Sequence, residues 1–195
     1  SRSLAAAAEA LQLEAIGGDA GGTQGYGRTD DEESLAALVE ARRLGCTFFD
    51  TSNLYGWGHA EELLGEAFAA CRHSVAIATK AGYVSPDGAQ DFSSAALYRS
   101  LEASLARLRT DYVALLQLHN PPTDALEDEW LCAALEAMKD DGLIRAWGVS
   151  ARTPDEALLF VTRYHPGCVQ VNFNLGDLRA LRGGLFDACR GRGNG

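Results

Sequence analysis

The sequence predicts an α/β fold in which short parallel strands alternate with helices. Short apolar runs alternate with longer segments whose apolar residues recur at helical spacing. The apolar runs contain few polar residues, which is typical of parallel strands buried on both faces. Three of the runs stop at a polar side chain, namely Asp50, Lys80 and His119. Repeated strand–helix units of this kind build either a doubly wound sheet or a (β/α)₈ barrel.

The composition indicates a single domain spanning residues 1–195. Of its 195 residues, 47% are hydrophobic, which is enough for a sizeable core. No apolar run approaches the roughly 20 residues of a membrane span, so no membrane association is expected. The net charge of -10 argues against nucleic acid as a partner, because an acidic surface repels it. The five cysteines occur singly, without metal-ligand spacing to the four histidines, which predicts no metal site and a reducing, cytoplasmic environment.

Residues 1–28 are expected to form an irregular, glycine-rich opening segment. A short strand is predicted from Leu11 to Ile16, and glycines are frequent between Gly17 and Gly27. Such glycines fit either a loop whose backbone passes close to a ligand or a flexible lead-in. Neither a G-x-x-x-x-G-K-[ST] nor a G-x-G-x-x-G sequence is present, so neither a P-loop nor a Rossmann site is supported.

Regular elements begin after Thr29. Asp30 is expected to cap a helix, because Glu33 follows three residues later, and Gly45 ends that helix. A buried strand over Thr47–Phe49 comes next. The pattern returns to helix from about Ala60, after a loop that contains two glycines.

Four further strand–helix units follow. Their strands are expected at Val75–Thr79, Tyr112–Leu118, Ala146–Val149 and Cys168–Val171. Their helices are expected to begin near Ser93, Trp130, Thr153 and Leu178, the last running to Cys189. The third of these helices has the clearest start, because Thr153 precedes a proline and Glu156 completes a capping box. The sequence therefore contains about six βα units.

The polar residues at the strand ends point to proton-transfer chemistry. Tyr55 lies in the loop after Asp50, and Lys80 and His119 follow the next two strands. Parallel strands place these ends on one face, so the four side chains can converge at a barrel mouth. A lysine ammonium beside the tyrosine hydroxyl favours the phenolate, and Asp50 holds the lysine charged. His119 can hydrogen-bond a substrate oxygen, which completes a general acid for a carbonyl group.

Each of these residues also has an ordinary structural explanation when it is taken alone. Asp50 suits a helix cap or a loop hydrogen bond, Lys80 a solvated strand end, and Tyr55 a packing residue with a wet hydroxyl. Their occurrence together after successive strands favours a site. Trp57 is expected either to line the substrate pocket or to cover the barrel rim.

Several stretches of the chain resemble the aldo-keto reductases, motif by motif and in order. They read LGCTFFDTSNLYGWGHAEELLGEA, VAIATK, DYVALLQLHNPP, GLIRAWGVS and VQVNFN, and the resemblance covers about Gly27 to Leu178. The part that matches DTxxxYGxGxxEexLG is highly specific. The resemblance implies a (β/α)₈ barrel that uses NADPH to reduce a small-molecule aldehyde or ketone.

The resemblance also implies a role for individual residues. Tyr55 is similar to the proton donor of the family, and Asp50 and Lys80 to the partners that adjust its acidity. His119 is similar to the residue that orients the substrate.

A second set of residues corresponds to the cofactor site of the family. Ser150 and Gln170 match positions that hydrogen-bond the nicotinamide carboxamide, next to Asp50. The family commonly has asparagine after that serine, whereas this chain has Ala151.

Six βα units are fewer than the eight of the family, so the fold is expected to be an incomplete (β/α)₈ barrel. Two unpaired sheet edges invite association, and a homodimer that covers them is expected. The segments that grip the cofactor phosphates would follow Cys189, so NADPH is expected to bind weakly or not at all. The alternative is a protein without redox activity, acting as a binding or scaffold module or as an acid–base enzyme for elimination or cyclisation. The sequence does not identify the substrate.

Overall fold

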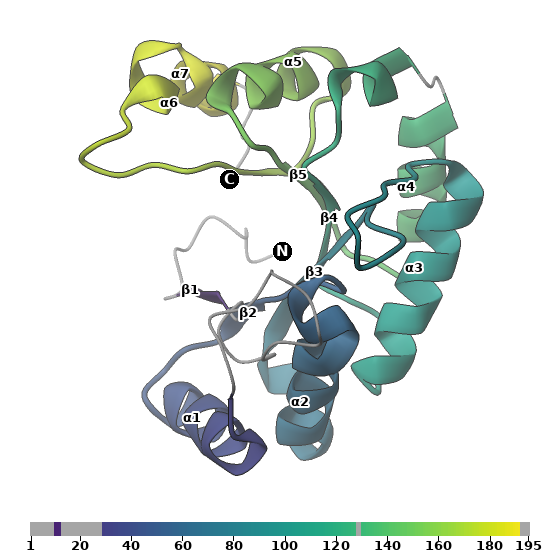
Figure 1. Ribbon diagram of the computed structural model, residues 1–195, viewed down its shortest axis with the longest axis vertical. Coiled ribbons are helices and arrows are strands. Elements are labelled where there is room, and N and C mark those ends of the chain that lie inside the picture. Colours follow the sequence, from purple (N-terminus) through teal and green to yellow (C-terminus); the bar gives the residue numbers. More distant parts are fainter. Residues whose placement is uncertain (1–9, 13–28, 128–129, 192–195) are drawn as a thin grey trace.

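The computed structural model of the protein describes residues 10–12, 29–127 and 130–191. Six parallel strands form one sheet in chain order. They are β1 (Ala10–Gln12), β2 (Phe48–Asp50), β3 (Ala76–Ala81), β4 (Leu115–His119), β5 (Trp147–Ser150) and β6 (Cys168–Gln170). The sheet curls, and the helices lie outside it (Figure 1). The architecture is an incomplete (β/α)₈ barrel, as predicted.

The helices follow the strands in the expected rhythm. They are α1 (Asp31–Arg43), α2 (His59–Phe68), α3 (Ser94–Arg107), α4 (Trp130–Asp140), α5 (Pro154–Tyr164), α6 (Arg179–Arg182) and α7 (Leu185–Arg190). The Asp30 carboxylate accepts the backbone N–H of Glu33 at 3.0 Å, which confirms the predicted cap. Thr153 and Glu156 form the predicted capping box at the start of α5.

Most strands end later than the sequence predicts. Asp50 is the last residue of β2, Lys80 lies inside β3, and His119 is the last residue of β4, whereas all three were expected beyond their strands. The ladder continues through them, with Lys80 opposite Gln117 and His119 opposite Ser150. These polar residues are accommodated in the buried sheet because Lys80 bonds to Asp50 and His119 bonds to Ser52.

Other boundaries differ from the prediction as well. The single helix expected from Leu178 to Cys189 is broken into α6 and α7, because Gly184 between them has a left-handed φ of 79°. The β4 strand begins at Leu115 and not at Tyr112. Of the predicted strand Leu11–Ile16, the first two residues belong to β1, and the rest lies outside the described residues, as does most of the opening segment.

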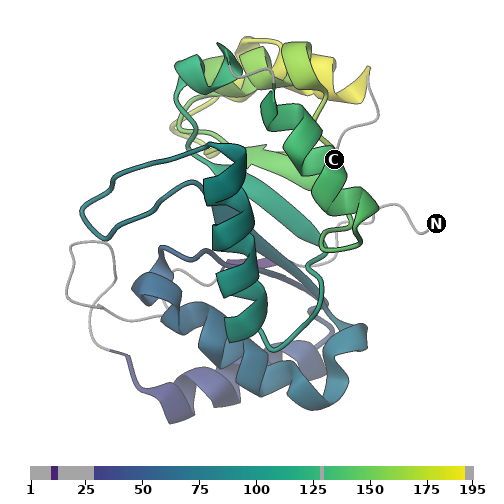
Figure 2. The ribbon, with the colours of Figure 1, turned by 90° about the vertical axis from the view of Figure 1, so that its right-hand side faces the viewer.

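The hydrophobic core lies between the curled sheet and the helices. The Phe49 ring of β2 and the Phe68 ring of α2 are both buried, with centroids 4.6 Å apart. Figure 2 shows α3 and α4 in front of the sheet. Each turns an apolar face inward, which includes Leu97 and Leu101 from α3 and Leu135 from α4.

A buried ion pair joins α2, β3 and α3. The Glu61 carboxylate, fully buried, accepts hydrogen bonds from Thr79 Oγ1 at 2.5 Å and from Arg107 Nε at 2.7 Å. Arg107 Nη2 also lies 2.6 Å from this carboxylate. The backbone of Gly58 packs against Arg107. A Cβ atom at position 58 would lie 2.7 Å from the arginine side chain. The loop before α2 therefore packs closely against this ion pair.

Replacing Glu61 with alanine is expected to lower the free energy of unfolding by about 3 kcal/mol, because a partly buried guanidinium loses its partner. Denaturant unfolding measures this change. Glu66→Ala removes an exposed partner of Arg109, 3.6 Å away, and is expected to cost at most about 1 kcal/mol. Equal effects of the two substitutions would contradict a supporting role for the buried pair.

None of the helices in the described part of the chain is long and apolar enough to cross a membrane. All five cysteines are free thiols.

Candidate active site

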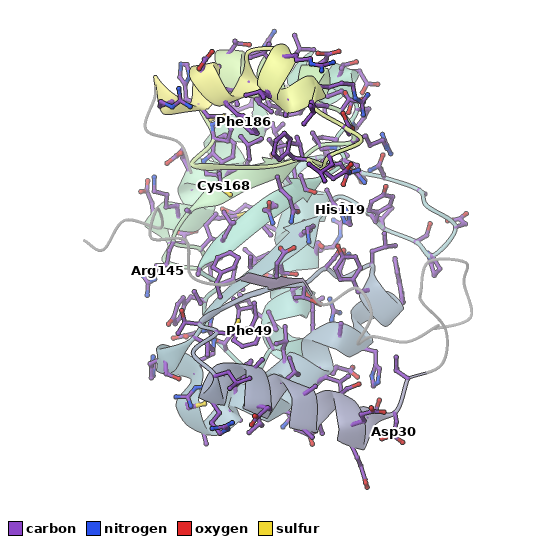
Figure 3. The ribbon with its side chains drawn as sticks, turned by 90° about the vertical axis from the view of Figure 1, so that its left-hand side faces the viewer. Asp30, Phe49, His119, Arg145, Cys168 and Phe186 are labelled. Atoms are coloured by element: carbon purple, nitrogen blue, oxygen red, sulfur yellow. The ribbon has the colours of Figure 1, made fainter. Side chains whose placement is uncertain are left out.

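The structure brings the four predicted catalytic side chains together at the carboxyl end of the sheet. Lys80 is the centre of the group, and its Nζ lies 2.7 Å from Asp50 Oδ2 and 3.2 Å from the Tyr55 hydroxyl. A third bond reaches the carbonyl of Thr51 at 2.9 Å. Tyr55 opens the short 3-10 turn Tyr55–Gly58 that follows β2. Figure 3 views the molecule from the open side of the curled sheet and labels His119 at the end of its strand.

The Lys80 ammonium is saturated with hydrogen bonds. It is only 1% exposed, and its three N–H groups match the three acceptors around it. Because the ammonium donates to the Tyr55 oxygen, the hydroxyl proton of Tyr55 points to a different acceptor. The lysine therefore stabilises negative charge on the tyrosine oxygen.

Two glutamines hold the Asp50 carboxylate. Gln117 Nε2 donates to Oδ1 at 3.0 Å, and Gln170 Nε2 donates to Oδ2 at 3.1 Å. The sequence analysis missed Gln117. The sequence feature that could have identified Gln117 is its position within an apolar strand. It lies two positions before His119 and therefore on the same face of the strand. Polar residues two positions apart on a buried strand lie on the same face, so they can belong to one polar site.

The imidazole of His119 is held neutral. Its pKa falls from 6.5 to about 3, first because of burial and then because of the positive charges of Lys80 and Arg152. Ser52 Oγ lies 3.1 Å from Nδ1, and the Tyr83 ring meets the imidazole edge-on with centroids 4.9 Å apart. The sequence analysis missed Ser52 and Tyr83, since neither stands at a strand end.

The low pKa of His119 predicts a loss of stability in acid. The unfolded chain takes up a proton at this residue between pH 6.5 and about 3, whereas the folded chain does not. Stability should therefore fall as the pH is lowered through this window, by up to about 1.4 kcal/mol per pH unit from this group. His119→Gln should show a correspondingly shallower dependence in denaturant unfolding at several pH values.

An independent measurement is the NMR titration of the histidine ring signals. The signals of His119 should stay constant from pH 8 down to about 5. Those of His59 should titrate above pH 6.5, because its hydrogen bond to Asp31 raises its pKa. A His119 signal that titrates near pH 6.5 would contradict the neutral assignment.

Two of the three predicted cofactor residues, Ser150 and Gln170, border the same cavity as Tyr55 and His119, whereas Asp50 is not part of its walls. This cavity has a volume of about 430 Å³, and its walls include Tyr55, Tyr83, His119, Ser150, Arg152 and Gln170. Ser150 and Gln170 are direct neighbours across β5 and β6. The Gln170 Oε1 atom is buried at the cavity wall and has no hydrogen-bond partner among the described residues, so it is an unused acceptor.

Trp57 lines a different cavity. Its neighbours there include Asn53, Tyr83 and Arg107, and the walls of the cavity that holds Tyr55 and His119 do not include Trp57. Trp57 therefore does not line the pocket next to Tyr55, which was one of the two alternatives left open by the sequence. Tyr83 belongs to both cavities and separates them.

Known proteins are similar to this chain in sequence and in fold. The family model described as "Aldo/keto reductase family" matches residues 15–194. The Bacillus subtilis protein named "Uncharacterized oxidoreductase YqkF" is 36% identical over 155 residues, which cover 77% of this chain and 50% of that protein. The chain thus spans about half the length of this relative.

Solved structures agree with this match. The holo form of aldo-keto reductase AKR11C1 from Bacillus halodurans superposes with a TM-score of 0.82 at 26% identity, covering 95% of this chain and 59% of that one. An aldo-keto reductase from Klebsiella pneumoniae in complex with NADPH gives a TM-score of 0.69 at 29% identity, covering 84% of this chain and 56% of that one. The chain therefore belongs to the aldo-keto reductase family.

Proposed function

We propose that this chain carries the catalytic site of an NADPH-dependent reductase of aldehydes or ketones, with Tyr55 as the proton donor. The observation that carries the proposal is the buried chain of contacts from Asp50 through Lys80 to the Tyr55 hydroxyl. A fully buried ammonium ion is costly unless it is paired, and here its charge is directed at a phenol. That arrangement suits a group that must give up a proton and then carry the negative charge.

The roles of the residues follow from these contacts. Tyr55 donates its proton to the carbonyl oxygen as negative charge develops there. Lys80, 3.2 Å away, stabilises the phenolate that remains, and Asp50 keeps the lysine charged. His119 is neutral, and its Nδ1 is engaged with Ser52, so Nε2 is the ring nitrogen left to orient the substrate oxygen.

The residues at the cavity wall fit a nicotinamide. The unused Gln170 Oε1 can accept a hydrogen bond from the carboxamide N–H₂ group, and Ser150 stands beside it on β5. Ala151 offers no side-chain hydrogen bond, so the carboxamide depends on the other two residues. Bound NADPH supplies the hydride that reduces the carbonyl carbon. The structure in complex with NADPH among the relatives supports this choice of cofactor.

The experiment that tests this proposal has two parts. NADPH fluorescence is first titrated with the 195-residue chain, and NADPH consumption is then followed with a panel of aldehydes and ketones. We expect weak but saturable binding of NADPH, and oxidation of NADPH that depends on the carbonyl compound. A folded chain that binds NADPH but consumes none with any carbonyl would contradict the reductase proposal.

A further inference from the structure

A second cavity lies beside the catalytic one, on the other side of Tyr83. Its volume is about 400 Å³, close to that of the catalytic cavity and within the range of small-molecule sites. The loop after β2, the loop after β3 and one face of α3 form its walls. They include Asn53, Trp57, Tyr83, Arg99, Ser100 and Arg107.

Trp57 gives this cavity an aromatic wall. Its backbone has a φ of 52°, a left-handed conformation that costs energy in a bulky residue. The side chain nevertheless remains 39% exposed, so burial of the ring does not explain that cost. A large aromatic surface held open at the edge of a cavity is typical of a binding site.

Arg99 gives the cavity a positive charge. Arg107, the other arginine in the wall, is tied to Glu61. Arg99 makes no ion pair within 4.0 Å with any described residue, although its charge contributes to the lowered pKa of Asp91. The chain as a whole carries a charge of -10, and the exposed Arg99 guanidinium at the cavity wall is a positive charge that can attract an anion locally.

Ser100, next to Arg99 on α3, lies in the same wall. Its Oγ atom is shielded from solvent and has no hydrogen-bond partner among the described residues, so a ligand oxygen reaches it only after the side chain rotates. The cavity thus combines a cation and an aromatic wall, with an unbonded hydroxyl behind them.

We propose that this cavity binds a small aryl carboxylate. The Arg99 guanidinium pairs with the carboxylate, and Ser100 donates to one of its oxygens once its side chain has rotated toward the cavity. The Trp57 and Tyr83 rings pack against the aromatic ring of the ligand. This binding does not depend on the proposed reductase activity.

The test is an NMR titration of the 195-residue chain with benzoate. We expect saturable shifts of the Trp57 indole N–H signal, assigned with Trp57→Phe, and little change at the Trp147 indole, which is bonded to Glu136. Arg99→Gln should weaken benzoate binding by about tenfold or more, because a charge-assisted hydrogen bond is lost. The matched control Arg109→Gln removes an exposed arginine outside the cavity and should leave the affinity unchanged.

Two further probes use the unaltered protein. Benzamide lacks the charge and acetate lacks the ring, so both should bind at least about tenfold more weakly than benzoate. The proposal is overturned if benzoate shows no saturable binding or binds equally well to the Arg99→Gln protein. The proposal is also overturned if the Tyr55→Phe substitution abolishes the benzoate-induced shift of the Trp57 indole N–H signal. The benzoate would then occupy the cavity that contains Tyr55.

Discussion

Tyr55→Phe is expected to lower the rate of carbonyl reduction by about 10²- to 10⁴-fold and to leave NADPH affinity nearly unchanged. The substitution removes the proton donor, whereas the cofactor is expected to be held by Ser150 and Gln170. Lys80 keeps its bonds to Asp50 and to the Thr51 carbonyl, so the fold should survive. Steady-state rates and NADPH fluorescence titrations on the same preparations measure the two effects separately.

The matched control for this prediction is Tyr98→Phe, which removes a hydroxyl group from a partly buried residue of α3. Tyr98 borders neither of the two cavities described above, so its loss should change the rate by less than about twofold. A Tyr55→Phe protein that reduces a good substrate within a few-fold of the parent rate would remove Tyr55 from the proposed role.

Lys80→Met is expected to damage both stability and catalysis. The Asp50 carboxylate, only 3% exposed, would keep its two glutamine donors but lose its counter-charge. Removing one partner of a buried ion pair costs about 3–5 kcal/mol of unfolding free energy. The Tyr55 phenolate would also lose its stabilising cation, so the reduction rate should fall by at least about 10²-fold and the pH–rate profile should move or collapse.

The double variant Asp50→Asn/Lys80→Met separates the two effects. Removing both charges should recover much of the lost stability, because no buried charge is left unpaired, while activity stays low. Lys139→Met is the matched control, since Lys139 pairs with Glu136 on the surface of α4 and should cost at most about 1 kcal/mol. Parent-like stability and an unchanged pH–rate profile in Lys80→Met would show that this lysine has neither role.

The sequence by itself determined the order of the elements and the convergence of Asp50, Lys80 and His119. These features depend on local patterns: apolar runs define strands, and parallel strands place their carboxyl ends on one face. Helix starts such as Thr153 were predictable for the same reason, because a capping box is contained within four residues.

Only the tertiary structure decided how the site is held and charged. Gln117 and Gln170 reach Asp50 from β4 and β6. The spacing within one strand can show which face a side chain takes, but it does not show which residue of another strand that side chain bonds. The low pKa of His119 arises from burial and from charges on neighbouring elements, which exist only once the sheet has formed. Tyr83 lies between Trp57 and the cavity that contains Tyr55 and His119, and this separation likewise depends on how two loops and α3 meet in space. Cavities are formed by surfaces that are remote in the chain.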